Sequence, residues 1–225
     1  MVLVITAAIG AGIAVLLTWA VQMAYEAVKQ ADGMASLDQP VLELAVSLRT
    51  PQNVAIAKFL TNLGGAVGLT VITLVIVTVM TLRWRSPTPV VLLGIGTAGS
   101  LLMTLVGKAV VGRARPPQAY AVPPYKTTPS FPSGHALNNT VIACLVAYLL
   151  LLHLTSLLSR IVSVVAAVCW FVTIGLTRVF LGYHWLTDVI AGWLLGLAWV
   201  ATVITCHRLY LTVLQVRRGP PLVGS

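Results

Sequence analysis

Residues 177–188 carry the sequence Thr-Arg-Val-Phe-Leu-Gly-Tyr-His-Trp-Leu-Thr-Asp, which places three ionisable side chains between two long apolar segments. An ionisable side chain in hydrocarbon costs at least ~2.5 kcal/mol, so residues of this kind are rare in membrane spans and are usually functional. His184 and Asp188 are four positions apart and would lie on one face of a helix that begins here. Arg178, His184 and Asp188 are therefore the first candidates for a functional site.

The composition of the chain indicates an integral membrane protein. Of its 225 residues, 58% are hydrophobic and 8% are charged, which is outside the range of soluble globular domains. A spanning helix needs ~20 apolar residues, so the length allows about six spans with short loops. We expect the all-α class, a polytopic bundle of six transmembrane helices in which residues 1–225 form a single domain.

The apolar segments predict spans at residues 1–27, 54–82, 89–111, 134–154, 161–180 and 185–210. The first segment has no Lys or Arg before Lys29, which favours a retained span over a cleaved signal peptide. A short amphipathic helix is predicted at residues 37–48, between spans one and two, on the membrane surface or over the bundle. Gly192 and Gly196 form a small-xxx-small pair that would let the last span pack closely against a neighbour.

Six spans would place the connections after the third and the fifth span on the same side of the membrane. All the polar clusters of the sequence flank these two connections, so we expect them to meet there. Basic residues occur at both ends of the predicted bundle. The positive-inside rule therefore leaves the orientation open.

The formal net charge of +9 restricts the binding partners. The chain has no continuous basic stretch and no alternation of aromatic and basic residues, so nucleic acid is not an expected partner. Anionic lipid headgroups or a phosphorylated substrate fit the charge better, with the bilayer as surroundings, and no protein partner is indicated. The three cysteines are odd in number and lie in apolar segments, which predicts packing roles rather than disulfides or a metal cluster.

Three segments together predict a phosphate-binding site. Lys108 and Arg115 are seven positions apart, two helical turns on one side. Pro132-Ser133-Gly134-His135 ends a loop and opens a helix, whose first backbone N–H groups are available to an anion. Arg178 adds a further donor suited to a phosphate that carries about −1.5 to −2 charges.

The histidines and the aspartate supply the remaining groups for phosphoryl transfer. The neutral imidazole of His184 can attack phosphorus if Asp188 keeps its other ring nitrogen protonated. Protonated His135 can donate a proton to the leaving oxygen. The sequence has no carboxylate cluster or histidine pair at metal-ligand spacing, so we expect metal-independent chemistry without a cofactor.

At these residues the chain resembles the type 2 phosphatidic acid phosphatase superfamily of membrane lipid phosphatases. The signatures of that family appear in order: Lys-x6-Arg-Pro at 108–116, Pro-Ser-Gly-His at 132–135, and Arg-x5-His-x3-Asp at 178–188. The resemblance extends over about residues 108–192. The family usually has serine where this chain has Thr177, and often proline where it has Leu186.

The resemblance implies a six-helix bundle whose active site lies at the extracytoplasmic surface of the cell membrane, with both termini in the cytoplasm. It implies a phosphohistidine intermediate on His184 and a general acid at His135. It also implies phosphate binding by a set of cationic, hydroxyl and backbone groups: Lys108, Arg115, Ser133, Gly134 and Arg178.

We therefore expect an integral membrane phosphatase that removes the terminal phosphate of a lipid phosphate or diphosphate. Polyprenyl diphosphate of the undecaprenyl type ranks first among the substrates, followed by phosphatidylglycerol phosphate and phosphatidic acid. Two alternatives remain open: a transporter or channel for phosphorylated lipids, and a phosphotransferase in which another acceptor replaces water.

Other polar and aromatic residues have simpler interpretations. Arg113 and Lys126 lack a signature position and are predicted to be solvated loop charges. His153 and His207 are expected at the opposite membrane face. Trp185 is expected to be an interfacial anchor.

Overall fold

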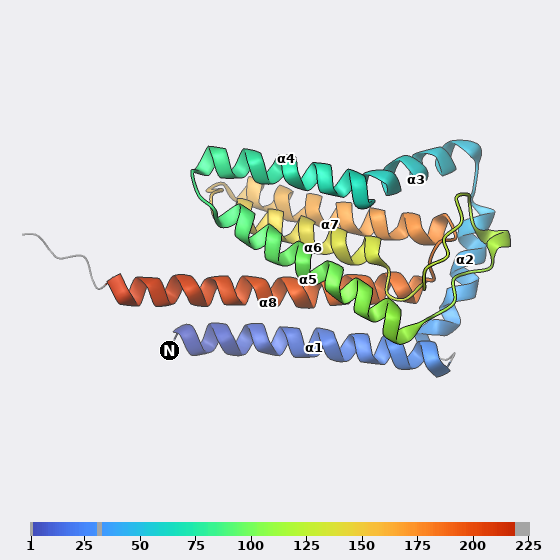
Figure 1. Ribbon diagram of the computed structural model, residues 1–225, viewed down its shortest axis with the longest axis horizontal. Coiled ribbons are helices and arrows are strands. Elements are labelled where there is room, and N and C mark those ends of the chain that lie inside the picture. The colour runs from blue at the N-terminus through green and yellow to red at the C-terminus, as the bar shows by residue number, and fades with distance from the viewer. Residues whose placement is uncertain (1, 31–32, 219–225) are drawn as a thin grey trace, which may run out of the picture.

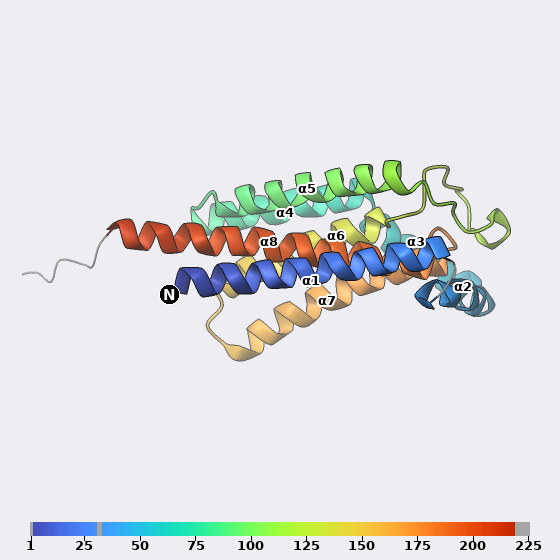
Figure 2. The same ribbon diagram turned by 90° about the horizontal axis from the view of Figure 1, so that it is seen from below.

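The computed structural model describes residues 2–30 and 33–218 and is helical throughout its regular elements, in agreement with the predicted all-α class. Most helices run side by side along the long axis, while α2 crosses one end of the bundle (Figures 1 and 2). In chain order the elements are α1 Val2–Gln30, the 3-10 turn η1 Gly33–Leu37, α2 Asp38–Ser47, α3 Pro51–Leu63, α4 Ala66–Trp84, α5 Thr88–Val111, the 3-10 turn η2 Gln118–Tyr120, α6 Gly134–Leu151, α7 Leu157–Phe180 and α8 Leu186–Arg218.

Among the described residues, five helices, α4 to α8, are long and apolar enough to cross a membrane. The predicted first span corresponds to α1, whose apolar part covers Ala7–Met23 and which lies alongside α8. The count of six spans stays a prediction, whereas an integral membrane protein is clear from the five. Met1, residues 31–32 of the predicted polar connection and residues 219–225 of the basic tail lie outside the described residues.

The predicted second span, residues 54–82, is wrong as a single helix. The segment forms α3 and α4, which are separated at Gly64 and Gly65. Gly65 has extended backbone angles, φ −79° and ψ 175°, and glycine has no side chain to favour helix over this conformation. Helix α3 has its own start, because the Thr50 hydroxyl accepts a hydrogen bond from the Asn53 N–H at 3.3 Å. The break keeps Lys58 and Thr61 at the end of the bundle instead of within a span.

Helix α6 forms the centre of the bundle. Its Leu137, Val141, Leu145 and Leu149 are buried and it packs against α5, α7 and α8. The predicted close approach of the last span is confirmed, because a Cβ at Gly196 would lie 2.8 Å from the Thr140 Cβ. The outer helices α4 and α7 instead expose many of their large apolar side chains, as lipid-facing helices do.

One end of the bundle collects α2, α3, the loop of residues 112–133, the C-terminal ends of α5 and α7, and the beginnings of α6 and α8; we call it the site end (Figure 1). The start of α1 and the C-terminal part of α8 lie at the opposite end. Helix α2 confirms the predicted short helix between the first two spans, with Leu42 buried and Leu44 exposed. All three signature segments therefore meet at the site end, as the sequence predicts.

Candidate active site

His184 lies in the short connection between α7 and α8. Gly182 has φ +73°, a left-handed conformation that favours glycine, and a Cβ there would lie 2.2 Å from the Tyr120 carbonyl oxygen. This turn folds the chain back on α7, so that the N–H of His184 donates to the Arg178 carbonyl at 3.2 Å. As a result the imidazole is directed into the bundle, with 2% of the residue exposed.

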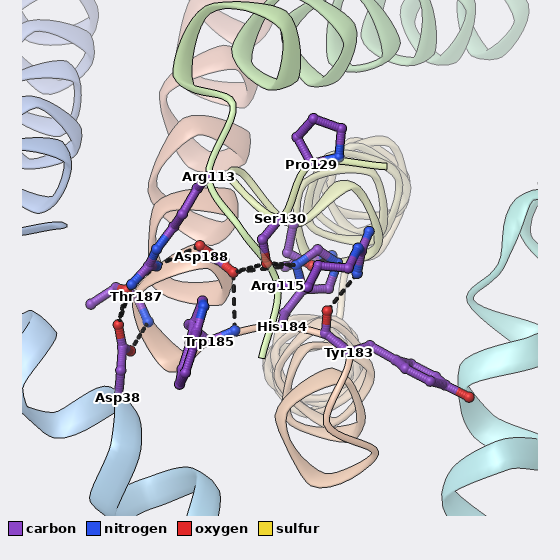
Figure 3. Close-up of polar contacts among 12 residues, drawn as sticks. Asp38, Arg113, Arg115, Pro129, Ser130, Tyr183, His184, Trp185, Thr187 and Asp188 are labelled. Carbon is purple, nitrogen blue, oxygen red and sulfur yellow. Dashed lines mark hydrogen bonds and ion pairs between the residues drawn. The ribbon is translucent and has the colours of Figure 1, made fainter. Parts of the chain in front are cut away.

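The Nδ1 side of the His184 ring faces oxygen atoms. Nδ1 lies 3.4 Å from Oδ2 of Asp188 and 3.3 Å from the Ser130 Oγ (Figure 3). Two oxygen partners assign the ring proton to Nδ1, since the Asp188 carboxylate can only accept. The lone pair is then on Nε2, which is the nitrogen free to act as a nucleophile.

The Asp188 carboxylate is held by several donors and is fully buried. Its Oδ2 accepts a hydrogen bond from the backbone N–H of Trp185 at 3.0 Å, which is one of the two bonds of a capping box at the start of α8. The Ser130 hydroxyl also donates to Oδ2, and Arg113 donates to Oδ1 at 2.6 Å. These contacts fix the carboxylate against the imidazole.

On the other side of the ring, Nε2 of His184 lies 3.4 Å from the guanidinium of Arg115. That guanidinium also donates to the Thr128 carbonyl at 2.6 Å and to the Tyr183 carbonyl, which fixes it in place. A donor beside the nucleophilic nitrogen is well placed to contact an oxygen of the group under attack.

Burial lowers the pKa of His184 from 6.5 to about 4. The cations Arg178 and Arg115 act in the same direction, and Asp188 opposes them. The imidazole is therefore neutral at pH 7, which is the form that a nucleophile requires.

His135 and Arg178 line a cavity of about 480 Å³ at the site end. Lys58, Lys126 and Tyr183 are among the other residues at its walls. Arg178 is 3% exposed, donates to the Thr61 hydroxyl at 2.7 Å and stacks on the Tyr183 ring at 4.4 Å. Its Nε atom is buried and has no hydrogen-bond partner among the described residues. An arginine with an unused donor in a cavity suits an anionic ligand.

The remaining predicted site residues occupy the start of α6 and the end of α5. Lys108 donates to the Pro129 carbonyl and lies within electrostatic range of Arg115 and Arg178.

Ser133 is the N-cap of α6, its hydroxyl accepting from the Ala136 N–H at 3.4 Å. Gly134 follows at the first position of the helix, where a Cβ would lie 2.8 Å from Thr104. The Thr177 hydroxyl donates to the Ile174 carbonyl at 2.6 Å and is therefore bound within α7.

The prediction that Arg113 is a solvated loop charge is wrong. Arg113 bridges two buried carboxylates, donating to Asp188 at 2.6 Å and to Asp38 at 2.7 Å. Asp38, which lies in the predicted amphipathic helix of residues 37–48, is 4% exposed. Trp185 is not only an interfacial ring, since the Arg113 guanidinium lies 5.6 Å from its centroid. The sequence gives one indication that Asp38 has a role: acidic residues are rare in this chain, which has five of them and 14 basic residues.

The apolar helices define an integral membrane protein, and its site end has a cavity lined by the cationic side chains Lys58, Lys126 and Arg178. The family model described as the PAP2 superfamily matches residues 89–210, and the chain belongs to this superfamily. This assignment confirms the resemblance inferred from the three signatures.

Named relatives agree with this assignment. The chain is 31% identical to phosphatidylglycerophosphatase B of Bacillus subtilis over 168 residues, 74% of this chain and 81% of that protein. It is 34% identical to an undecaprenyl-diphosphatase of Sulfolobus acidocaldarius over 106 residues, 45% of this chain and 47% of that protein. The crystal structure of a transmembrane PAP2 type phosphatidylglycerolphosphate phosphatase from Bacillus subtilis superposes with a TM-score of 0.78 at 27% identity, covering 87% of this chain and 96% of that one.

Proposed function

We propose that the chain hydrolyses the terminal phosphate of a membrane lipid phosphate or diphosphate through a phosphohistidine on His184. Polyprenyl diphosphate of the undecaprenyl type is the first substrate, and phosphatidylglycerol phosphate and phosphatidic acid are the next. The observation that carries this function is the geometry of His184: a buried, neutral imidazole with Nδ1 facing Asp188 and Nε2 beside Arg115.

In the first step, the lone pair of Nε2 forms a bond to phosphorus while the bond from phosphorus to the lipid oxygen breaks. His135 gives its proton to that oxygen, so the lipid product leaves neutral at this atom. Asp188 stabilises the positive charge that develops on the His184 ring. In the second step, His135 takes a proton from water, the water oxygen attacks phosphorus, and the bond between phosphorus and Nε2 breaks.

Five residues bind the phosphate in this mechanism. Arg115 and Arg178 supply guanidinium donors and Lys108 an ammonium group, which stabilise charge on the equatorial oxygens. Ser133 and Gly134 stand at the N-terminus of α6, where the first backbone N–H groups have no partner within the helix. The N–H of Ser133 donates to the Asp188 carbonyl at 3.0 Å, which leaves that of Gly134 for the phosphate. The buried Nε of Arg178 supports this assignment, because a phosphate oxygen in the cavity would give it a partner.

The donor set supports chemistry without a metal. The part of the chain that the structure describes contains no group of three or more His, Cys, Asp and Glu side chains arranged to hold a metal ion. The charge neutralisation that a divalent cation provides elsewhere is available here from lysine and arginine side chains.

The cavity itself favours a diphosphate carried on a lipid. Lys58 and Lys126 line it beyond the signature residues and can neutralise a second phosphate. Ala66 and Val67, at the start of the membrane helix α4, form another part of its wall, and Val67 is 80% exposed. A lipid tail attached to a phosphate in the cavity can pass over this edge into the bilayer. The named relatives that act on phosphatidylglycerophosphate and undecaprenyl diphosphate support the same substrate classes.

The test of the function is release of inorganic phosphate from a panel of lipids by the purified protein in the presence of EDTA. Wild type should release phosphate from polyprenyl diphosphate, and His184→Ala should release none. A wild type that binds the lipids but releases no phosphate would contradict hydrolysis and favour transport. Loss of the substrate without free phosphate, with a phosphorylated acceptor formed instead, would identify a phosphotransferase.

The substrate preference has a separate test in the two cavity lysines. The double variant Lys58→Gln, Lys126→Gln should lose at least about tenfold in kcat/KM for polyprenyl diphosphate, the effect of one charge-assisted contact of about 1.4 kcal/mol. It should lose less for phosphatidic acid, which has a single phosphate. Arg85→Gln, at the opposite end of the bundle, is the control. Equal losses for both lipids would contradict a role for these lysines in binding a second phosphate.

A further inference from the structure

A second ionic group adjoins the proposed catalytic residues. Asp38 and Arg113, here the Asp38–Arg113 pair, are joined by a hydrogen bond of 2.7 Å between the Arg113 guanidinium and Oδ2 of Asp38 (Figure 3). The same guanidinium donates to Oδ1 of Asp188 at 2.6 Å and to the Thr187 hydroxyl at 2.7 Å. Asp38 therefore connects to the catalytic aspartate through a single arginine.

Asp38 also caps a helix to which it does not belong. Its Oδ1 accepts from the backbone N–H of Thr187 at 2.9 Å and its Oδ2 accepts from the Thr187 hydroxyl at 2.6 Å. Thr187 lies in the first turn of α8, whose N–H groups have no partner within the helix and carry partial positive charge. The carboxylate thus fixes α2 to the start of α8, the turn that contains Asp188.

Arg113 is the arginine that both carboxylates contact. Asp38 is 4% exposed and Asp188 is fully buried, so neither is stabilised by bulk water. Removing one member of a buried ionic group leaves an uncompensated charge, which is far less favourable than the intact group. Arg113 also holds Asp188 by Oδ1 alone, and this leaves Oδ2 directed at His184.

We propose that Asp38 and Arg113 are positioning residues for the phosphatase reaction, fixing Asp188 so that the nucleophilic nitrogen of His184 stays aligned for attack. Neither residue lines the cavity. This role rests on the proposed function through the nucleophilic role of His184. It adds an element outside the three signatures, because Asp38 lies on α2, 70 residues before the first of them.

The pair should act on His184 through charge as well as through position. The groups that face His184 are Asp188 on α8, Arg178 on α7, His135 on α6 and Arg115 in the loop. In Arg113→Gln the Asp188 carboxylate loses its cation and attracts the imidazole proton more strongly, so the pKa of His184 should rise. In Asp38→Asn the charge of Arg113 acts on Asp188 alone, so the pKa of His184 should fall. A change of about one pH unit is expected for one unit charge at this range.

The experiment is a nitrogen-15 NMR titration of the imidazoles in the purified full-length protein. The chain has four histidines, and His184→Ala identifies the resonances of His184. Arg113→Gln and Asp38→Asn should shift the His184 titration in opposite directions. Arg113→Lys, which keeps the charge, should titrate like wild type, and Arg160→Gln, at the opposite end of the bundle, is the control for general effects.

Phosphate release by the same variants gives the second readout. Arg113→Gln and Asp38→Asn should lower kcat by about 10- to 100-fold, the usual effect of losing a residue that orients a catalytic group, with KM unchanged. An unchanged His184 titration in both variants would overturn the positioning role, whether or not the enzyme is active. Failure of wild type to release phosphate would instead overturn the proposed function, since the titration does not depend on turnover.

Discussion

Replacing Ser130 by alanine should reduce turnover without weakening substrate binding. The Ser130 hydroxyl is fully buried, donates to Oδ2 of Asp188 and lies 3.3 Å from Nδ1 of His184. It lies on the Nδ1 side of the ring, away from the Nε2 atom that is proposed to attack phosphorus, so the phosphate should bind as before. The backbone N–H of Ser130 donates to the Arg113 carbonyl at 2.8 Å and is unaffected by the change.

The size of the effect follows from the one bond that is lost. A hydrogen bond to a charged group contributes about 1.5–3 kcal/mol, and each 1.36 kcal/mol in the barrier is a factor of ten. If the carboxylate needs this donor to stay aligned with the ring, kcat should fall by about 10- to 150-fold. KM should stay within about twofold of wild type, because the change does not remove a contact that binds the substrate before the reaction.

The assay is steady-state phosphate release from one lipid substrate, with thermal melting of each protein alongside. Ser100→Ala is the matched control, since Ser100 is equally buried but donates to the Thr97 carbonyl at 3.0 Å within α5. Equal loss of activity in both variants would mean that the Ser130 effect is a general packing effect. A Ser130→Ala enzyme with wild-type kcat would refute the view that this hydroxyl aligns the carboxylate.

Three further changes test the fold, the buried histidine and the topology. Gly196→Ala should destabilise the protein by about 1–3 kcal/mol because its Cβ would meet Thr140, whereas Gly94→Ala, with nothing within 4 Å, should melt at or above the wild-type temperature. The pKa of His184 is about 4 in the folded protein and 6.5 in the unfolded chain, so the free energy of unfolding should fall as the pH drops below 6.5. Between pH 7 and pH 5, wild type should lose about 2 kcal/mol more of this free energy than His184→Gln does. Equal losses in the two proteins would contradict a buried neutral ring. In a background without native cysteines, Gln118→Cys should react with an impermeant maleimide added outside cells; reaction only after permeabilisation would place the site end in the cytoplasm.

The sequence predicts most of the bundle because membrane spans are determined by length and hydrophobicity. The break at Gly64 and Gly65 could not be predicted in the same way, since both glycines lie within a continuous apolar pattern and glycine alone does not end a membrane helix. The boundary depends on tertiary contacts: the Asn139 amide of α6 donates to the Gly64 carbonyl at 2.8 Å. That partner is 75 residues away in the chain.

The convergence of the signature residues could be predicted, because alternate connections of a bundle share one end.

The Asp38–Arg113 pair could not be predicted from the sequence, for a physical reason. Asp38 fits the polar face of an amphipathic helix and Arg113 fits a loop, so neither violates its local pattern. Only the packing of α2 across the start of α8 brings Asp38 to Thr187 and Arg113. Thr177, which stands where the family usually has serine, has its hydroxyl bonded within α7.

The charges at the site end suggest why His184 must be neutral and why the acidic residues are so few. Asp38 and Asp188 lie on Arg113, and together these three carry one net negative charge. Lys108, Arg115 and Arg178 have no carboxylate partner among the described residues. Two positive charges therefore remain for a phosphate that carries about −1.5 to −2. A protonated His184 would add a third positive charge, and its ring would no longer have the lone pair that attacks phosphorus. The charge of a second phosphate would be neutralised by Lys58 and Lys126, which line the cavity. Arg113 supplies the direct contact that holds the Asp188 carboxylate, so Lys108, Arg115 and Arg178 need not bind this carboxylate in place of the phosphate.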